Sequence, residues 1–174
     1  TERTAGKAIA GPHPSLVFVI GSELRGPIGE AIQKAEGRSV LIGNRLDSIG
    51  VPSVMLDDGQ SIRLAIAHLR AAGHRKIGLI SADADLPISR LQKSVWLGEC
   101  AGEATPEELE NRVISVPMPR FECPAMQAYT TMLEYFRSGR ADMTAFFCQV
   151  DEMMPGILAA LREVGLFVPQ DMSV

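Results

Sequence analysis

Short apolar runs alternate along the chain with longer segments in which apolar residues recur at helical spacing. The runs at 16–20, 40–42, 54–56, 77–80, 112–116 and 145–148 are brief and rich in branched side chains, and they predict strands buried on both faces. Segments at 27–35, 62–69, 86–101, 125–136 and 151–164 predict helices. This alternation is typical of an α/β protein built on doubly wound parallel sheets.

Turn and cap residues support the same boundaries. The segment Thr105-Pro106-Glu107-Glu108 is typical of an N-cap followed by proline at the first helical position. Asp57 and Asp151 each precede a predicted helix, so we expect them to act as caps. Glycines follow three predicted helices where a left-handed residue is expected: Gly73, Gly102 and Gly165.

Composition narrows the class of protein. A length of 174 residues with 46% hydrophobic residues fits one domain or two small lobes and excludes a disordered chain. Neither a membrane-spanning apolar run nor a secretion signal is visible, which favours a cytoplasmic protein. A net charge of −4 makes nucleic-acid binding through bulk charge unfavourable. The three scattered cysteines, Cys100, Cys123 and Cys148, predict reduced thiols in or near the core.

Polar side chains follow several predicted strands. In doubly wound sheets, ligands bind beyond the carboxyl ends of the strands. Asn44 follows the strand at 40–42, Arg90 lies shortly after the strand at 77–80, and Val150 and Asp151 follow the strand at 145–148. Asparagine and arginine side chains suit a hydroxyl-rich small molecule.

No complete catalytic arrangement is present. The chain lacks a glycine-rich phosphate loop and a Gly-x-Ser-x-Gly elbow. His68 and His74 are isolated from any cysteine pair, so we expect no metal site, no cofactor and no catalytic residue. Asp83 and Asp85 leave open one alternative, an acid–base pair in a small α/β hydrolase or transferase.

Four segments, in order, resemble the LacI/GalR family of bacterial transcriptional regulators. They are Val54-Met55-Leu56-Asp57-Asp58 with the later His68-Leu69, Gly73-His74-Arg75-Lys76-Ile77, Thr144-Ala145-Phe146-Phe147-Cys148 with Asp151, Met153 and Gly156, and the ending from Gly165-Leu166 to Ser173-Val174. The resemblance covers residues from about 38 to 174, and more loosely from about 14. It implies an effector domain of the type I periplasmic-binding-protein-like fold, with two α/β lobes closing on a small molecule.

The resemblance also implies a division of the chain. Residues 1–73 correspond to part of the N-terminal lobe and residues 74–174 to most of the C-terminal lobe. Such proteins carry a helix-turn-helix at the N-terminus and bind operator DNA as dimers. We therefore expect a truncated effector domain, a homodimer, and contact with operator DNA through a helix-turn-helix that the sequence lacks.

Carried over one at a time, five positions form the expected ligand site. Arg90 corresponds to the family's ligand-gripping arginine and Asn44 to a polar contact. Val150 replaces a family asparagine and implies an apolar wall, whereas Asp57 and Asp151 are expected to hold strand ends at the pocket.

These positions predict a regulator that binds a sugar-like or more apolar effector between two lobes and thereby changes operator binding. The same fold also serves solute-binding proteins of transport systems, so that alternative stays open beside the enzyme. A signal peptide upstream of Thr1 would favour transport, and a helix-turn-helix there would favour regulation.

Overall fold

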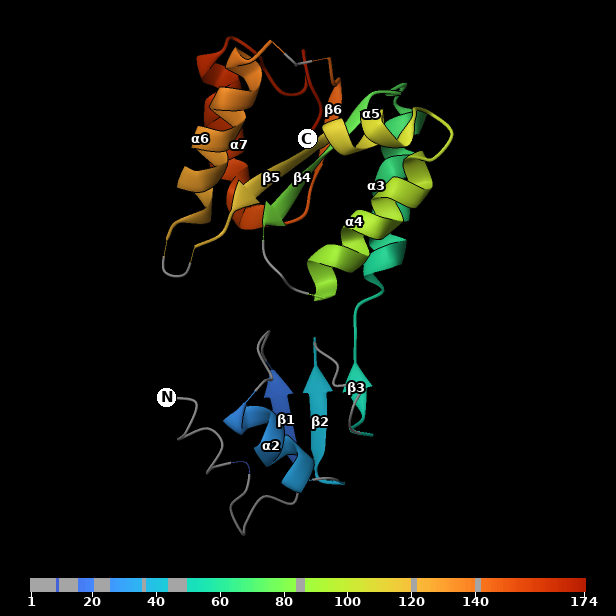
Figure 1. Cartoon of the computed structure of the whole chain (residues 1–174), viewed down its shortest axis with the longest axis vertical. Helices are drawn as coiled ribbons and strands as arrows, with labels where there is room; N and C mark the ends of the chain where they lie inside the picture. The colour runs from blue at the N-terminus through green and yellow to red at the C-terminus, as the bar shows by residue number, and fades with distance from the viewer. Residues whose placement is uncertain are drawn as a thin grey trace. The chain divides into compact units, whose positions relative to one another are not determined.

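The computed structural model describes residues 9, 16–20, 26–35, 37–43, 50–83, 87–119, 122–139 and 142–174. The chain divides into two compact units, Thr1–Asp57 (unit 1) and Asp58–Val174 (unit 2), which are described separately (Figure 1). Each unit has its own parallel sheet, of order β1-β2-β3 in unit 1 and β5-β4-β6 in unit 2. The predicted α/β class with parallel sheets is confirmed.

Unit 1 contains a small sheet with one described helix against it. Strands β1 (Val17–Ile20), β2 (Ser39–Ile42) and β3 (Ser53–Val54) are parallel, with Phe18 opposite Val40 and Ile42 opposite Val54. Helix α2 (Pro27–Lys34) joins β1 to β2. Neighbouring parallel strands need a long crossover connection of this kind, because a tight turn would reverse the direction of the chain. Its buried residues and those of the sheet form one apolar cluster: Ile9, Ala31, Ile32, Ala35, Leu41 and Val51.

The expectation that the strands of unit 1 are buried on both faces is wrong. Phe18 and Ile20 are 61% and 77% exposed, while Leu41 on the middle strand is fully buried. Val54 and Leu56 are also exposed. Because side chains alternate across a strand, burial on one face of the sheet leaves the other face of β1 open to solvent. An apolar run therefore predicted the strand correctly but not its surroundings.

Unit 2 is centred on β4 (Ile77–Asp83), which is almost wholly buried. It pairs in parallel with β5 (Val113–Pro117) on one side and with β6 (Ala145–Cys148) on the other. Ser173, at the end of the chain, makes an isolated parallel bridge to Ala145. Its amide donates to the Thr144 carbonyl at 3.2 Å, and its carbonyl accepts from the Phe146 amide at 2.9 Å. These two hydrogen bonds hold Ser173 beside the start of β6.

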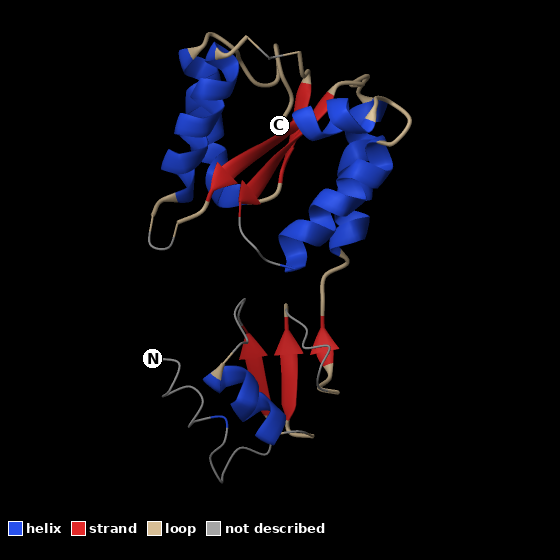
Figure 2. Ribbon diagram, viewed as in Figure 1, coloured by secondary structure: helices blue, strands red, loops and turns tan. Residues whose placement is uncertain are grey.

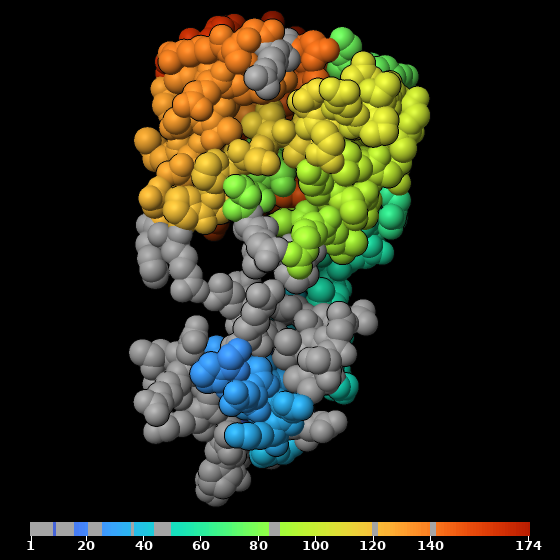
Figure 3. All heavy atoms as spheres, in the orientation of Figure 1, coloured from blue at the N-terminus to red at the C-terminus, as the bar shows by residue number. Residues whose placement is uncertain are grey.

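Helices cover both faces of this sheet and give unit 2 three layers (Figure 2). One face carries α6 (Pro124–Arg137) and α7 (Met154–Glu163), and the other carries α3 (Asp58–Ala71), α4 (Pro87–Cys100) and α5 (Pro106–Asn111). In the space-filling view, the orange surface that includes α6 and the yellow-green surface that includes α4 lie side by side on the near face of unit 2 (Figure 3). Two apolar clusters fill the layers, one around Ile80, Met132, Phe146 and Met153, the other around Ile66, Ile77, Leu79 and Trp96.

The helix ends follow the expected signals. Gly102 and Gly165 have φ angles of 91° and 79°, the left-handed conformation that glycine adopts without steric cost. Thr105 forms a capping box with Glu108: its hydroxyl accepts from the Glu108 amide at 3.3 Å, and the Glu108 carboxylate accepts from the Thr105 amide at 2.7 Å. Hydrogen bonding to the Glu108 carboxylate, first from the Thr105 backbone amide and then from the Thr105 side chain, holds the pKa of this carboxyl below its ordinary value.

Helix α3 packs with unit 2, because Ile62 and Ile66 belong to the same apolar cluster as Trp96 of α4. The boundary between the two compact units therefore falls between Asp57 and Asp58 in the sequence, before the lobe boundary expected after residue 73. The lobe assignment itself stays a prediction. No helix among the described ranges is long and apolar enough to cross a membrane.

Candidate functional site

A partly buried polar network lies at the carboxyl ends of β4 and β6, where the topology predicts a ligand site. The Oε1 atom of Gln149 accepts from the Ser81 hydroxyl at 2.9 Å and from the Ala82 amide at 3.1 Å. Its Nε2 atom donates to the Ser89 carbonyl at 3.2 Å. Gln149 therefore joins three elements: the end of β6, the end of β4 and the first turn of α4.

This network brings two of the expected site residues near one another. Arg90 directly follows Ser89, and Val150 directly follows Gln149, so each lies one residue from the Gln149–Ser89 hydrogen bond. Arg90 is exposed on the first turns of α4, and Val150 is half-buried. The Cys148 thiol donates to the Val150 carbonyl at 3.1 Å, which fixes the backbone there. The Val150 side chain packs against the apolar cluster on the α6–α7 face of the sheet, whereas Arg90 belongs to α4 on the other face.

Asp151 occupies a different position from the expected one. Residues Asp151–Met153 form a 3₁₀ turn ahead of α7, and Asp151 is its first residue rather than the residue before a long helix. Its carboxylate accepts from the Glu152 amide at 3.1 Å, and its side chain is exposed. The acidic group therefore lies at the carboxyl end of β6, close in sequence to Val150.

The remaining expected site residues belong to unit 1. Asp57 is exposed and directly precedes the first residue of α3. Asn44 lies outside the described residues. Their place in a ligand site stays a prediction.

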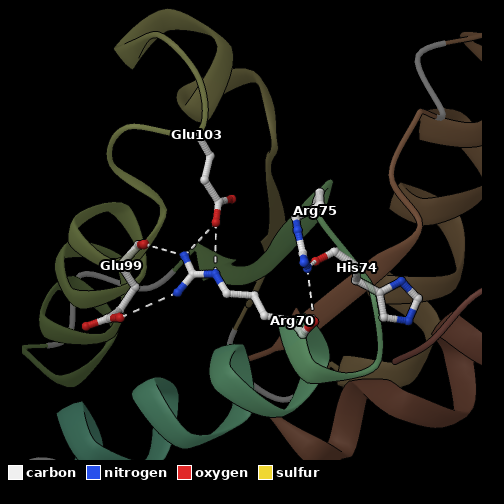
Figure 4. A network of polar contacts seen from close by, with 5 residues as sticks. All are labelled: Arg70, His74, Arg75, Glu99 and Glu103. Atoms are coloured by element: carbon white, nitrogen blue, oxygen red, sulfur yellow. Dashed lines mark hydrogen bonds and ion pairs between the residues drawn. The ribbon is translucent and has the colours of Figure 1, made fainter.

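The basic residues of the Gly-His-Arg-Lys-Ile segment make structural contacts far from these strand ends. Arg75 donates from one Nη atom to the carbonyls of Arg70 and His74, both at 2.9 Å, and so satisfies the end of α3 (Figure 4). Lys76 pairs with Asp142 at 2.9 Å. Hydrogen bonding to this ammonium holds the Asp142 pKa below its ordinary value.

Arg70 anchors the end of α3 to the end of α4. Its guanidinium donates to Glu103 at 2.8 Å through Nε, donates to the Glu99 carbonyl, and lies 3.8 Å from the Glu99 carboxylate (Figure 4). His74 makes a second tie: its two ring nitrogens lie 2.9 Å from the Thr144 and Ser173 hydroxyls. These contacts explain the segment as a fold determinant rather than a ligand site.

A groove of about 470 Å³ runs along β6 on the side away from β4. Its walls come from α3, from the start of α7 and from the end of the chain. Its lining includes Ala65, His68, Leu69, Phe147, Met154 and Val174. Cys148 and Gln149 also line it, and burial raises the pKa of the Cys148 thiol. The groove is more apolar than the strand-end network.

The three cysteines differ in how deeply they are buried. Cys100 is buried and Cys148 half-buried, in agreement with the expectation, but Cys123 is exposed at the N-cap of α6. The expectation is therefore wrong for Cys123. Burial raises the pKa of the Cys100 thiol from 9.0 to about 11. Within the described ranges, no three His, Cys, Asp or Glu side chains are grouped to hold a metal ion.

Gln149 is the residue that sequence reasoning did not single out as a site residue. It follows a predicted strand, but so do several polar residues, and its partners Ser81 and Ser89 are far away in the sequence. The proximity of three donors and acceptors arises only when β6 pairs with β4. The available signal was its position at a strand end next to Val150.

Three comparisons place the chain among known proteins. The family model described as the periplasmic binding protein-like domain matches residues 66–174. The HTH-type transcriptional regulator reg1 of Streptomyces lividans is 28% identical over 183 aligned residues, covering 100% of this chain and 49% of that protein. The chain spans less than half the length of the curated relatives it matches.

Solved structures share the fold. A LacI-family transcriptional regulator from Burkholderia phymatum superimposes with a TM-score of 0.74 at 22% identity, covering 100% of this chain and 62% of that one. A complex of the transcriptional regulator CelR with cellobiose gives a TM-score of 0.73 at 24% identity, covering 98% of this chain and 51% of that one.

Proposed function

Because the chain belongs to the family of periplasmic-binding-protein-like domains, we propose that it is the effector-sensing portion of a LacI-type transcriptional regulator. The curated relatives are named as transcriptional regulators and not as enzymes. The resemblance to LacI/GalR regulators found in the sequence is confirmed by the same relatives and by the shared fold. In the whole protein, a helix-turn-helix contacts operator DNA and the effector domain acts as a homodimer in the cytoplasm.

The mechanism we propose is a shift between two arrangements of the effector domain. A small molecule that binds one arrangement more tightly raises its population by the difference in binding free energy. Linkage then requires that operator DNA and effector change each other's affinity by the same factor. No covalent step or cofactor is needed for this activity.

The observation that carries the proposal is the match of residues 66–174 to the periplasmic binding protein-like domain. The hydrogen bond from Gln149 to Ser89, which joins the end of β6 to the start of α4, supports a site at these strand ends. The Gln149 side-chain amide makes three hydrogen bonds within the protein, to Ser81, Ala82 and Ser89. Arg90 supplies a planar fork of donors for a hydroxyl, carboxylate or phosphate oxygen. Val150, which packs against the cluster on the α6–α7 face, supplies an apolar side chain at the end of β6. This pairing fits an effector with one acceptor-rich end and one apolar face.

Cellobiose is a rational first probe, because the similar regulator CelR was solved in complex with it. The test is a thermal-shift screen of the 174-residue chain against cellobiose, other disaccharides, monosaccharides and small apolar carboxylic acids. A ligand present at 100 times its dissociation constant adds about 2.7 kcal/mol to the free energy of unfolding, which raises Tm measurably. A reproducible rise that calorimetry confirms as saturable binding supports an effector domain. A panel without any such rise contradicts the proposal for these ligand classes.

A further inference from the structure

A side chain completes the hydrogen-bond ladder between β6 and β4. The two strands pair in parallel as far as Ile80 and Cys148, so Gln149 is the next residue beside β4. The first half of its rung is regular, because the Gln149 main-chain amide donates to the Ile80 carbonyl at 3.0 Å. In a regular parallel ladder the Gln149 main-chain carbonyl would accept from the Ala82 amide. The side-chain Oε1 atom of Gln149 accepts from that amide instead, at 3.1 Å.

The Gln149 side chain therefore fills a polar subsite at the strand ends. The subsite has two donors, the Ser81 hydroxyl and the Ala82 amide, which both donate to Oε1. It has one acceptor, the Ser89 carbonyl, which accepts from Nε2 at 3.2 Å. Ser81 and Ser89 are only 6% and 9% exposed, so the subsite is built from buried residues. A primary amide carries an acceptor oxygen beside a donor nitrogen and so matches this pattern.

Other functional groups match the subsite less well. A carboxylate has no N–H and places a second acceptor against the Ser89 carbonyl. A tertiary amide keeps the oxygen but likewise has no donor for that carbonyl. Because a buried polar group without a partner costs free energy, such a subsite discriminates between ligands by their hydrogen-bonding pattern.

We propose that the strand-end site contains a primary-amide subsite that Gln149 itself occupies, and that Gln149 is thereby a specificity-determining residue. The inference rests on the proposed function, because it concerns the same site. With Gln149 in place, an effector finds Ser81, Ala82 and Ser89 already paired and binds through other groups at these strand ends. Gln149 is half-buried, so a smaller residue at this position opens the subsite to an amide from solvent.

The test uses acetamide as the probe and Gln149→Ala as the variant. Alanine removes the carboxamide and leaves its three partners in place. We expect Gln149→Ala to have a lower Tm than the unaltered chain in thermal unfolding followed by circular dichroism. We expect acetamide to raise the Tm of the variant saturably, with a roughly millimolar dissociation constant, the scale for so small a ligand. The unaltered chain should show no saturable rise.

Matched probes and variants test the hydrogen-bonding pattern and the location. N,N-dimethylacetamide and acetate lack an N–H for the Ser89 carbonyl, and we expect neither to raise the Tm of Gln149→Ala. Gln127→Ala also removes a carboxamide, but one whose hydrogen bond to Glu122 is exposed, so acetamide should not affect it. Gln149→Met refills the subsite with an apolar side chain and should not respond to acetamide either.

The inference is overturned if acetamide has no saturable effect on Gln149→Ala, or if it acts equally on the unaltered chain or on Gln127→Ala. An equal effect of N,N-dimethylacetamide overturns it too. If Gln149→Ala shows no cooperative unfolding by itself, acetamide has to restore it, and failure to do so has the same meaning. Acetamide binding to Gln149→Ala beside an unresponsive effector panel contradicts the proposed function alone.

Discussion

The Nε2 atom of Gln149 lies 3.2 Å from the carbonyl oxygen of Ser89, although 60 residues separate the two positions in the sequence. This hydrogen bond connects the end of β6 to the start of α4. Arg90 directly follows Ser89 in α4, and Val150 directly follows Gln149 at the end of β6. The geometry of the candidate site therefore depends on one neutral amide.

Replacing Gln149 tests this dependence. Gln149→Glu keeps the oxygen that accepts from Ser81 and Ala82 but loses the donor to Ser89, so a carboxylate faces a carbonyl. We expect a loss of about 1–3 kcal/mol in the free energy of unfolding at neutral pH, the cost of leaving a buried polar group unsatisfied. The loss shrinks at a pH low enough to protonate the new carboxyl, because the acid then donates. Urea unfolding at several pH values measures both effects.

The control for this variant is Gln127→Ala, which removes an exposed hydrogen bond to Glu122. We expect a change below about 0.5 kcal/mol there, as for most surface substitutions. Equal losses for the two glutamines would contradict the role assigned to Gln149.

Arg90→Ala tests the proposed ligand contact. Loss of a hydrogen bond to a charged donor weakens binding by about 1.5–3 kcal/mol. Titration calorimetry with the ligand that gives the largest thermal shift measures this difference. Lys93→Ala is the control, because Lys93 lies one turn further along α4 and pairs with Glu110 at 2.8 Å. Unchanged affinity in Arg90→Ala removes Arg90 from the site.

Gly156 tests the packing of α7 on α6. A Cβ atom at this position would lie 1.8 Å from the Ala125 carbonyl oxygen, so Gly156→Ala forces the two helices apart. We expect Gly156→Ala to lower the free energy of unfolding by about 1–3 kcal/mol, the range for overpacking in a core. Gly98→Ala is the matched control: nothing lies within 4 Å of its Cβ position in α4. Helix propensity there predicts a gain of about 0.4–1 kcal/mol. Chemical denaturation of both variants measures the contrast.

The three thiols predict a chemical order and a pH dependence. Iodoacetamide at pH 8 should modify exposed Cys123 first and buried Cys100 last, as peptide mass spectrometry reports. The Cys100 pKa rises from 9.0 to about 11 in the folded chain. Its contribution to stability is therefore complete below pH 9 and is lost as the pH rises toward 11. Cys100→Ala should flatten this part of the stability profile, and an unchanged profile would contradict the assignment.

Local features of the sequence predicted the secondary structure well. The capping box at Thr105, the left-handed Gly102 and Gly165, and the strand Ala145–Cys148 are confirmed, because each depends on residues close in the chain. The burial of side chains was predicted less well. Exposure of Phe18 and Ile20 depends on whether a layer covers the second face of the sheet, which periodicity does not encode.

The candidate site was predicted less completely for the same reason. The strand-end rule selected Arg90 and Val150, whose place in a ligand site stays a prediction. It did not select Gln149, because the contacts of that amide cross 60 to 68 residues of sequence. The motif resemblance also drew attention to His74 and Arg75, whose observed contacts stabilise the fold. A family motif can thus mark a packing requirement as readily as a binding residue.

The two strand orders have a consequence for assembly during synthesis. In the sheet β1-β2-β3 each strand pairs with its predecessor in the chain, so pairing can proceed as residues emerge. In the sheet β5-β4-β6 the first strand is the central one, and its second partner begins at Ala145. One edge of β4 therefore stays apolar and unpaired until β6 has been synthesised, more than 60 residues later. That interval is when unit 2 is most exposed to aggregation and most in need of a chaperone.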